Sequence, residues 1–168
     1  PLRALASLTL RGAMILSTGG DLLWYSPRPS VARDLKTVTY RGERMLALHQ
    51  SAADRPAHYE LLDRRYRTVA RIRTRNGYRT NLHELQLTRR GTAYVSAYQA
   101  VRHPASGRLV TDYVIQEIDV ATRDVLFEWH SLDHVPPSAS YQTRPRRRYS
   151  WDYFHGNSIE PPDGSGTI

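Results

Sequence analysis

Apolar and polar residues alternate along most of the chain, and short turn sequences interrupt the alternation. The stretch "AMILSTGGDLLWY" has two apolar runs around Gly19-Gly20-Asp21, and "TVTYRGERMLAL" turns at Arg41-Gly42-Glu43. The stretch "LHELQLTRRGTAYVSAY" alternates on both sides of Arg90-Gly91. Alternation bounded by glycine turns is typical of β-hairpins. Because no segment keeps a long helical stripe of apolar residues, the sequence predicts an all-β fold.

Two types of hairpin recur in alternation. In the first type, an aspartate that follows an apolar residue is separated by five residues from a valine, as in the pairs Asp63 and Val69, and Asp119 and Val125. A shorter relative begins at Ser17. In the second type a polar residue precedes a turn glycine by eight or nine positions, as in the pairs Asp34 and Gly42, His83 and Gly91, and His155 and Gly164. Alternating hairpins combine into units of four strands.

The four-strand units predict the blades of a β-propeller, whose first strands line a central channel. One unit spans residues 34–73 and the other 82–130, with a half-blade at each end. We therefore expect one incomplete propeller domain over residues 1–168, in which a long proline-containing loop spans 131–154. A small sandwich with Greek-key connections is the structural alternative.

The charge of the chain invites a nucleic-acid interpretation, because the formal net charge is +8. The basic residues are scattered along strands and turns, apart from the cluster Arg144 to Arg148, and all are arginine except Lys36. We therefore expect no nucleic-acid partner. The cluster "RPRRRY" predicts either a solvated loop or an anion-attracting rim around a pocket, because the arginine fork matches sulfate and phosphate oxygens.

Composition excludes several other classes. The chain has no cysteine, so disulfides and thiolate chemistry are excluded within it. No apolar stretch approaches the length of a membrane-spanning helix, and we expect none. The N-terminal residues 1–10 carry no signal-peptide pattern, and Pro1 is interpreted as a cut within a longer protein.

The histidines are the candidate chemical residues, because familiar catalytic motifs and phosphate-binding glycine loops are absent from the sequence. His83 and His155 occupy equivalent positions, predicted to begin the first strands of successive blades. Two imidazoles at the channel mouth could donate hydrogen bonds or exchange protons, and capping of the strand starts is the structural alternative. A metal site at His130 and His134 is not expected, because Pro136 follows and disfavours a helix there.

The remaining histidines, His49, His58 and His103, lie near predicted turns and have no repeating partner. We expect them at the surface. Glu84 follows His83 directly, and neighbouring side chains of a strand point to opposite faces. Glu84 could therefore orient the His83 imidazole only if the strand twists.

Three stretches, "LHELQLTRRGTAYVSAYQ", "VIQEIDVATRDVLFEWHSLDHVP" and "WDYFHGNSI", resemble the arylsulfotransferase family. The resemblance extends from about Gly12 to Ile168 and implies a six-bladed, exported propeller, although this chain carries no signal peptide. It also implies transfer of a sulfuryl group from an aryl sulfate to a phenol through a sulfated histidine, with no cofactor and no nucleotide sulfate donor.

The resemblance assigns His83 and His155 to the channel-mouth histidines that assist binding and charge stabilisation. The family's nucleophilic histidine would lie in later blades beyond Ile168, so the chain is interpreted as an inactive fragment of an enzyme. The expected substrate-binding residues are His83, His155, Asn157, His130 and His134.

Two departures from the family pattern weaken the expectation of an intact pocket. Gly156 replaces a bulky apolar residue, and "MLALHQS" replaces an aromatic-rich strand. A non-catalytic ligand-binding or scaffolding propeller is the functional alternative.

Overall fold

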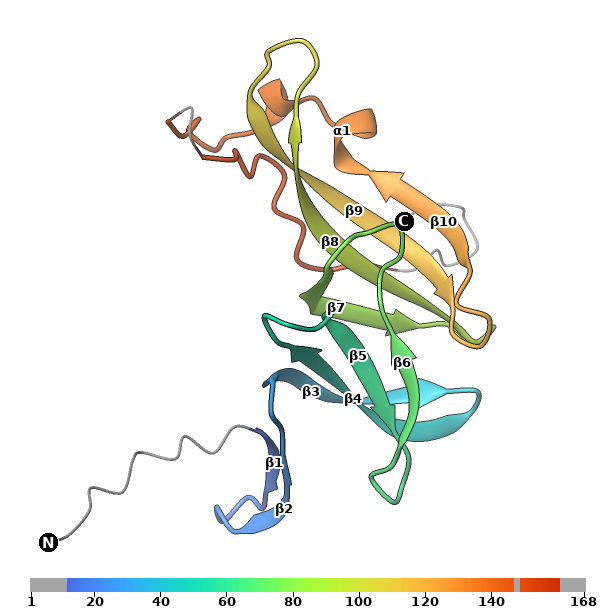
Figure 1. Ribbon diagram of the computed structural model, residues 1–168. Helices are drawn as coiled ribbons and strands as arrows, with labels where there is room; N and C mark the ends of the chain where they lie inside the picture. Colours follow the sequence, from blue (N-terminus) through green and yellow to red (C-terminus); the bar gives the residue numbers. More distant parts are fainter. Residues whose placement is uncertain (1–11, 147–148, 161–168) are drawn as a thin grey trace, which may run out of the picture.

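The computed structural model describes residues 12–146 and 149–160, which form three antiparallel sheets (Figure 1). A two-stranded sheet comes first, and two four-stranded sheets follow. Within each sheet, strands that are consecutive in sequence lie side by side, as in the blades of a propeller. The strands are β1 (Gly12–Leu16), β2 (Leu22–Pro27), β3 (Val31–Tyr40), β4 (Glu43–Ser51), β5 (His58–Leu62), β6 (Thr68–Ile72), β7 (Thr80–Leu87), β8 (Thr92–Arg102), β9 (Leu109–Asp119) and β10 (Val125–His130). The predicted all-β partial propeller is confirmed.

The first type of hairpin owes its turn to a polar side chain that binds backbone amides. Asp63 Oδ1 accepts the N–H groups of Arg65 and Arg67 at 2.8 and 2.9 Å. Asp119 plays the same part between β9 and β10 for two amides of its own turn, both at 2.8 Å. In the shorter relative, Ser17 Oγ accepts the N–H of Asp21 at 3.0 Å. These contacts satisfy amides that would otherwise need water, which explains why the motif repeats.

In the two described hairpins of the second type, the turn contains a glycine with a positive φ angle. Gly42 turns β3 into β4 at φ 81°, and Gly91 turns β7 into β8 at φ 84°. An irregularity precedes both turns, because the register shifts between Arg33 and Lys36 in β3 and within Thr80–Leu85 in β7. Bulges of this kind re-aim the side chains of a strand, and they fall on the segments that carry Asp34 and His83.

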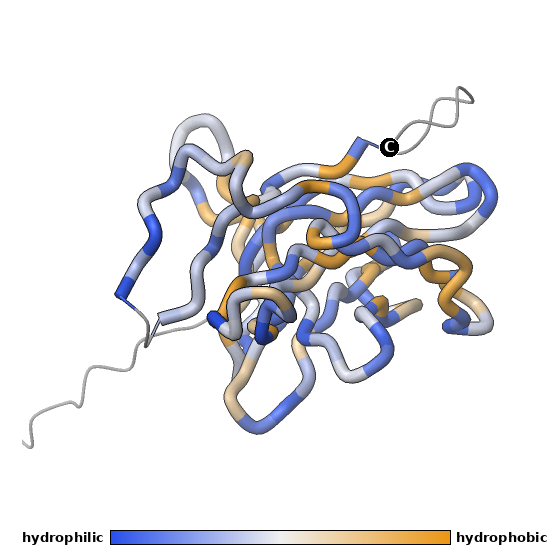
Figure 2. The backbone as a smooth tube through the Cα atoms, turned by 90° about the horizontal axis from the view of Figure 1, so that it is seen from above, coloured by the Kyte–Doolittle hydropathy of each residue, from blue (hydrophilic) through white to orange (hydrophobic). Residues whose placement is uncertain are grey.

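The two four-stranded sheets share a buried core between their faces. Tyr59, Leu61 and Ile72 of the first sheet are in one cluster with Leu85 and Val95 of the second. All five are at most 2% exposed. Full burial of such side chains stabilises a fold by roughly 1.5–3 kcal/mol each. Figure 2 shows hydrophobic and hydrophilic positions interleaved along the backbone, and several of the projecting loops are hydrophilic.

The chain after β10 returns across the far face of the second sheet. It contains α1 (Ser131–His134) and a 3-10 turn, η1 (Pro137–Ala139), within the predicted long loop. Trp151 then pairs with Val110 of β9 in an isolated parallel bridge. Trp151 and Tyr153 bury themselves against this sheet, so the returning segment forms part of the fold.

Three expectations need correction or qualification. His83 lies inside β7, not at its first residue. Residues 152–160 contain no strand, so His155 does not begin one within the described part of the chain, and its turn glycine, Gly164, lies outside it. His49 is 2% exposed, not at the surface, because its ring packs edge-on against Tyr59.

Among the described residues, no helix has the length and apolar character needed to cross a membrane.

Candidate functional site

His83 and His155 both lie close to the ring of Tyr98. The centre of the Tyr98 ring is 6.4 Å from that of His83 and 5.9 Å from that of His155. The His155 ring is stacked on Tyr98, whereas the His83 ring meets it edge-on. β7 supplies His83, β8 supplies Tyr98, and the segment after Trp151 supplies His155. The fold therefore brings together two histidines that are far apart in sequence.

A carboxylate orients the His155 imidazole. Asp152 Oδ2 contacts Nδ1 of His155 in a very short hydrogen bond. An ionised carboxylate only accepts, so Nδ1 carries the hydrogen and Nε2 is left for a ligand. His155 also has a φ angle of 50°, which is uncommon for a residue with a side chain. Strained backbone of this kind is concentrated at functional sites, and the His155 side chain is 55% exposed.

Asn81 orients His83 in a similar way. Its Oδ1 accepts the backbone N–H of His83 at 2.8 Å and contacts Nδ1 of the same residue at 2.5 Å. Because an atom that accepts from an amide N–H is an oxygen, Nδ1 of His83 must donate to it. In both histidines, therefore, Nδ1 is the ring nitrogen that a neighbouring side chain engages.

Aromatic rings form a wall beside the two histidines. Tyr98 and Tyr113 are directly opposite each other in β8 and β9, with ring centres 5.2 Å apart. Phe154 stacks on Tyr113 at 5.9 Å and is 36% exposed. The Tyr98 hydroxyl donates to the carbonyl of Gly156, which ties the His155 segment to the sheet.

Gly156 has no side chain because the Tyr113 ring fills the available space. A Cβ atom at this position would lie 2.3 Å from Tyr113 Cε1. The departure from the bulky residue expected after the histidine thus has a local steric cause in this chain.

Burial perturbs the pKa of Tyr98. Burial, with a smaller contribution from Asp152, raises the pKa of Tyr98 to about 12. Tyr98 therefore stays neutral near neutral pH and acts as a hydrogen-bond donor.

Glu84 does not orient His83. It accepts from Lys36 Nζ at 2.9 Å, and the same ammonium group lies 3.0 Å from Asp34 Oδ2. Asp34 is the residue of β3 that matches His83 in the repeat. The single lysine of the chain therefore joins two neighbouring sheets at the strands that carry the candidate site.

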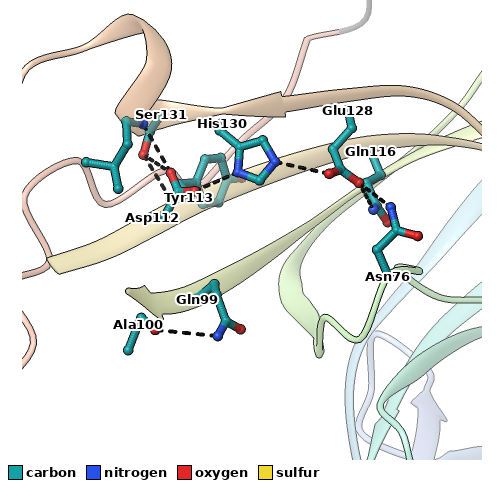
Figure 3. Close-up of polar contacts among 10 residues, drawn as sticks. Asn76, Gln99, Ala100, Asp112, Tyr113, Gln116, Glu128, His130 and Ser131 are labelled. Carbon is teal, nitrogen blue, oxygen red and sulfur yellow. Dashed lines mark hydrogen bonds and ion pairs between the residues drawn. The ribbon is translucent and has the colours of Figure 1, made fainter. Parts of the chain in front are cut away.

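His130 is the centre of a separate ionic network (Figure 3). Its Nδ1 lies 2.6 Å from Asp112 Oδ2, and its Nε2 lies 3.0 Å from Glu128 Oε1. Asp112 also accepts from the Ser131 hydroxyl at 2.9 Å, and Glu128 accepts from Asn76 at 2.7 Å. Burial disfavours the charged imidazole, but the hydrogen bonds to both carboxylates outweigh it and raise the pKa of His130.

The His130 network lies apart from the His83 and His155 pair, and it leaves neither ring nitrogen of His130 free for a ligand. β10 and β7 are the opposite edges of their sheet, so His130 and His83 lie on different strands at its two sides. Both ring nitrogens of His130 are already engaged by carboxylates. His134 stacks flat on Trp129 with ring centres 5.1 Å apart. The assignment of His130 and His134 to the substrate stays a prediction, as does that of the exposed Asn157.

Within the described residues, no three histidine, aspartate or glutamate side chains are grouped so that they could hold a metal ion. The arginine cluster is described only in part. Arg144 lies over Trp151, with its Cζ atom 4.9 Å from the ring centre, while Arg147 and Arg148 are outside the described residues.

The sequence predictions did not include two residues of the site, Asp152 and Tyr98. Asp152 stands three positions before His155, and this spacing is a local signal that could have revealed it. Tyr98 had no such signal, because it reaches the site through pairing of β8 with its neighbours.

In a comparison with families of known proteins, residues 48–167 match the family described as "Arylsulfotransferase (ASST)". This match covers more than half of the chain. The chain belongs to the arylsulfotransferase family. No curated protein and no solved structure matches it significantly. The match includes both histidines, Tyr98 and Asp152, and it leaves out the N-terminal hairpin and β3.

Proposed function

We propose that the complete protein is an arylsulfotransferase, in which His83 and His155 assist transfer of a sulfuryl group from an aryl sulfate to a phenol. The observation that carries the proposal is the placement of both imidazoles against Tyr98. Family membership supplies the reaction class. An extracytoplasmic location is part of the same proposal.

The two histidines would act on the charge that moves during transfer. The sulfur–oxygen bond to the donor phenol breaks, a bond to a nucleophile forms, and negative charge develops on the leaving phenolate oxygen. Nε2 of a protonated imidazole can donate to a sulfate oxygen or to that phenolate, because Nδ1 is already held by Asp152 or Asn81. The nucleophilic histidine implied by the resemblance is not among the residues assigned here.

The aromatic wall suits the aryl part of the substrate. Phe154 is partly exposed beside Tyr113, and offset stacking of aromatic rings adds about 0.5–1.5 kcal/mol beyond burial. Neutral Tyr98 would hold the His155 segment in place through its bond to the Gly156 carbonyl. The site thus combines groups for the ring and groups for the sulfate.

The test measures phenol release by the complete protein at saturating concentrations of the aryl sulfate donor and the phenol acceptor. We expect His83→Ala and His155→Ala each to lower turnover by roughly a hundredfold, because each removes a donor aimed at developing charge. Substrate affinity is expected to change less. His103→Ala is the control, since His103 lies in the turn between β8 and β9.

Turnover by both variants at the rate of the control would contradict the proposal. The histidines would then be structural caps, and a ligand-binding propeller without catalysis would be favoured. The 168-residue chain alone is expected to release no phenol under the same conditions.

A further inference from the structure

A cleft lies beside the outer strand of the first blade, and neither histidine of the candidate site lines it. β6 is the edge strand of its sheet, and both β6 and the turn between β9 and β10 can be followed in Figure 1. Residues of both line the cleft. The segment after β2 and the connection from β4 to β5 complete its walls. Its volume is about 790 Å³, within the range of pockets that hold small ligands.

Arginine dominates the lining of this cleft. Six arginines contribute to it, whereas only two carboxylates do, those of Glu60 and Asp119. The arginines are Arg28, Arg55, Arg71, Arg73, Arg75 and Arg123. The cleft therefore carries an excess of positive charge on a surface where strand and turn residues converge.

The carboxylates of the cleft are already engaged. Glu60 is 5% exposed and binds Arg28 and Arg71, each at 3.0 Å. Hydrogen bonding from His58 and Arg71 outweighs burial and lowers the pKa of Glu60 to about 2, so it stays ionised. Asp119 holds the amides of its own turn. Within the described part of the chain, the guanidinium groups of Arg73 and Arg123 have no ion-pair partner.

Buried donors without acceptors provide an independent observation. Gln50 is 4% exposed, and its Oε1 accepts from Ser30, yet its Nε2 has no hydrogen-bond partner among the described residues. Arg28 Nε is likewise buried and unpaired there. Unpaired buried donors are costly, and both residues line the cleft, so a small shift of either side chain towards a ligand oxygen would relieve that cost.

The lining also limits the class of ligand. No phenylalanine, tyrosine or tryptophan lines the cleft in the described residues, which disfavours stacked aryl groups and nucleobases. Hydroxyl and amide groups of Ser51, Thr68 and Gln50 suit the hydroxyls of a sugar. Arginine forks bind sulfate and phosphate oxygens in pairs.

We propose that this arginine cleft binds an anionic sugar that carries at least two sulfate or phosphate groups. The site is independent of the proposed transfer reaction, because it lies on other strands and needs no turnover. One oxyanion would bind near Arg28 and Gln50, and a second would be held by Arg73 and Arg123 across the cleft.

The experiment is calorimetric titration of the 168-residue chain at about physiological ionic strength. The probes are a sulfated tetrasaccharide and a sugar bisphosphate, which separate the two oxyanion sources. We expect saturable binding of one ligand per chain by at least one probe. The double variant Arg73→Gln/Arg123→Gln should weaken binding about tenfold or more, because each charge-assisted hydrogen bond contributes at about that level.

The matched control is Arg44→Gln/Arg89→Gln, which removes the same charge from exposed arginines outside the cleft. An unchanged affinity in this control supports the proposal. Equal weakening in both double variants, equal affinity for oligothymidylate of matched charge, or no binding of either sugar would overturn it. If the Arg73→Gln/Arg123→Gln protein does not fold, Arg73→Gln alone is expected to weaken binding in the same direction.

Discussion

At the scale of single residues, the candidate site is partly exposed, yet close steric and polar contacts hold its side chains in place. Gly156 leaves room for the ring of Tyr113, and Asp152 fixes the imidazole of His155. Elsewhere, His130 holds two carboxylates together. The contacts of Gly156 with Tyr113 and of His130 with Asp112 join segments that the sequence separates, whereas Asp152 and Glu128 lie within three residues of the histidines they bind.

Replacement of Gly156 by alanine tests the close approach to Tyr113. A Cβ atom 2.3 Å from the ring forces the ring or the segment to move, and such overpacking costs about 1–3 kcal/mol of unfolding free energy. Urea denaturation measures the change. Gly19→Ala is the control, because the nearest atom to its Cβ would be 3.6 Å away. Equal midpoints for wild type and Gly156→Ala would contradict the expected clash.

The ionic network predicts how stability depends on pH. The raised pKa of His130 makes its contribution complete below the ordinary value of 6.5, and this contribution is lost as pH rises through the folded value. The lowered pKa of Glu128 makes its contribution complete above 4.5, and this one is lost as pH falls through the folded value. Hydrogen bonding to Gln116, His130 and Asn76 lowers the pKa of Glu128 against the opposing effect of burial.

We therefore expect His130→Gln to destabilise the chain most between these two ordinary pKa values, by about 1–3 kcal/mol, since hydrogen bonds to charged groups are lost. The measurement is the unfolding free energy of wild type and variant in mildly acidic and in alkaline buffer. The difference between them should shrink in the alkaline buffer. A difference that does not vary with pH would show that the imidazole acts only by packing.

At the scale of the elements, neighbouring sheets are joined by polar contacts as well as by their shared core. The Tyr59 hydroxyl of β5 donates towards Asp34 Oδ2 at 3.0 Å and the Leu82 carbonyl at 2.8 Å. Asp34 lies on β3 and Leu82 on β7, so the contacts of one ring reach the inner strands of both sheets. Burial raises the pKa of Tyr59, which keeps the hydroxyl protonated as a donor.

Tyr59→Phe removes this link and keeps the ring. We expect a loss of about 0.5–1.5 kcal/mol in unfolding free energy, the usual net contribution of one hydrogen bond, because Asp34 keeps its ion pair with Lys36. Tyr141→Phe is the matched control, since Tyr141 is fully exposed. Thermal unfolding followed by circular dichroism measures both variants. Equal melting temperatures for the two variants would show that the Tyr59 hydroxyl contributes nothing to stability.

At the scale of the whole molecule, the N-terminal hairpin leaves apolar side chains in contact with water. Met14, Leu16, Leu22 and Leu23 are all at least 50% exposed. Propeller blades bury such faces against their neighbours, and an uncovered strand pair invites association. Trp24 stacks on Tyr66 of the first blade, which fixes one side of the hairpin only.

We therefore expect the 168-residue chain to self-associate, and Leu22→Ser/Leu23→Ser to reduce the association. Sedimentation velocity over a range of concentrations measures it. Val69→Ser is the control, because Val69 is 50% exposed but belongs to another sheet. A monodisperse wild-type monomer at all concentrations would contradict the prediction.

The sequence alone determined the strands and their turns, because both depend on local properties. Alternation specifies which side chains of a strand face the core, and Asp63 and Asp119 bind amides only a few residues away. The repeat of these local signals also predicted the four-stranded sheets, and the resemblance predicted the family. The domain limits and the substrate residues stay predictions.

Only the tertiary structure decided which residues meet. His83 and His155 both reach the ring of Tyr98 because strand pairing and the return of the chain beside β9 bring three distant segments together. The same packing buries His49, which was expected at the surface, and brings Asp112 to one ring nitrogen of His130. Contacts between distant segments depend on how whole sheets pack, and a local pattern of apolar and polar residues carries no information on that packing.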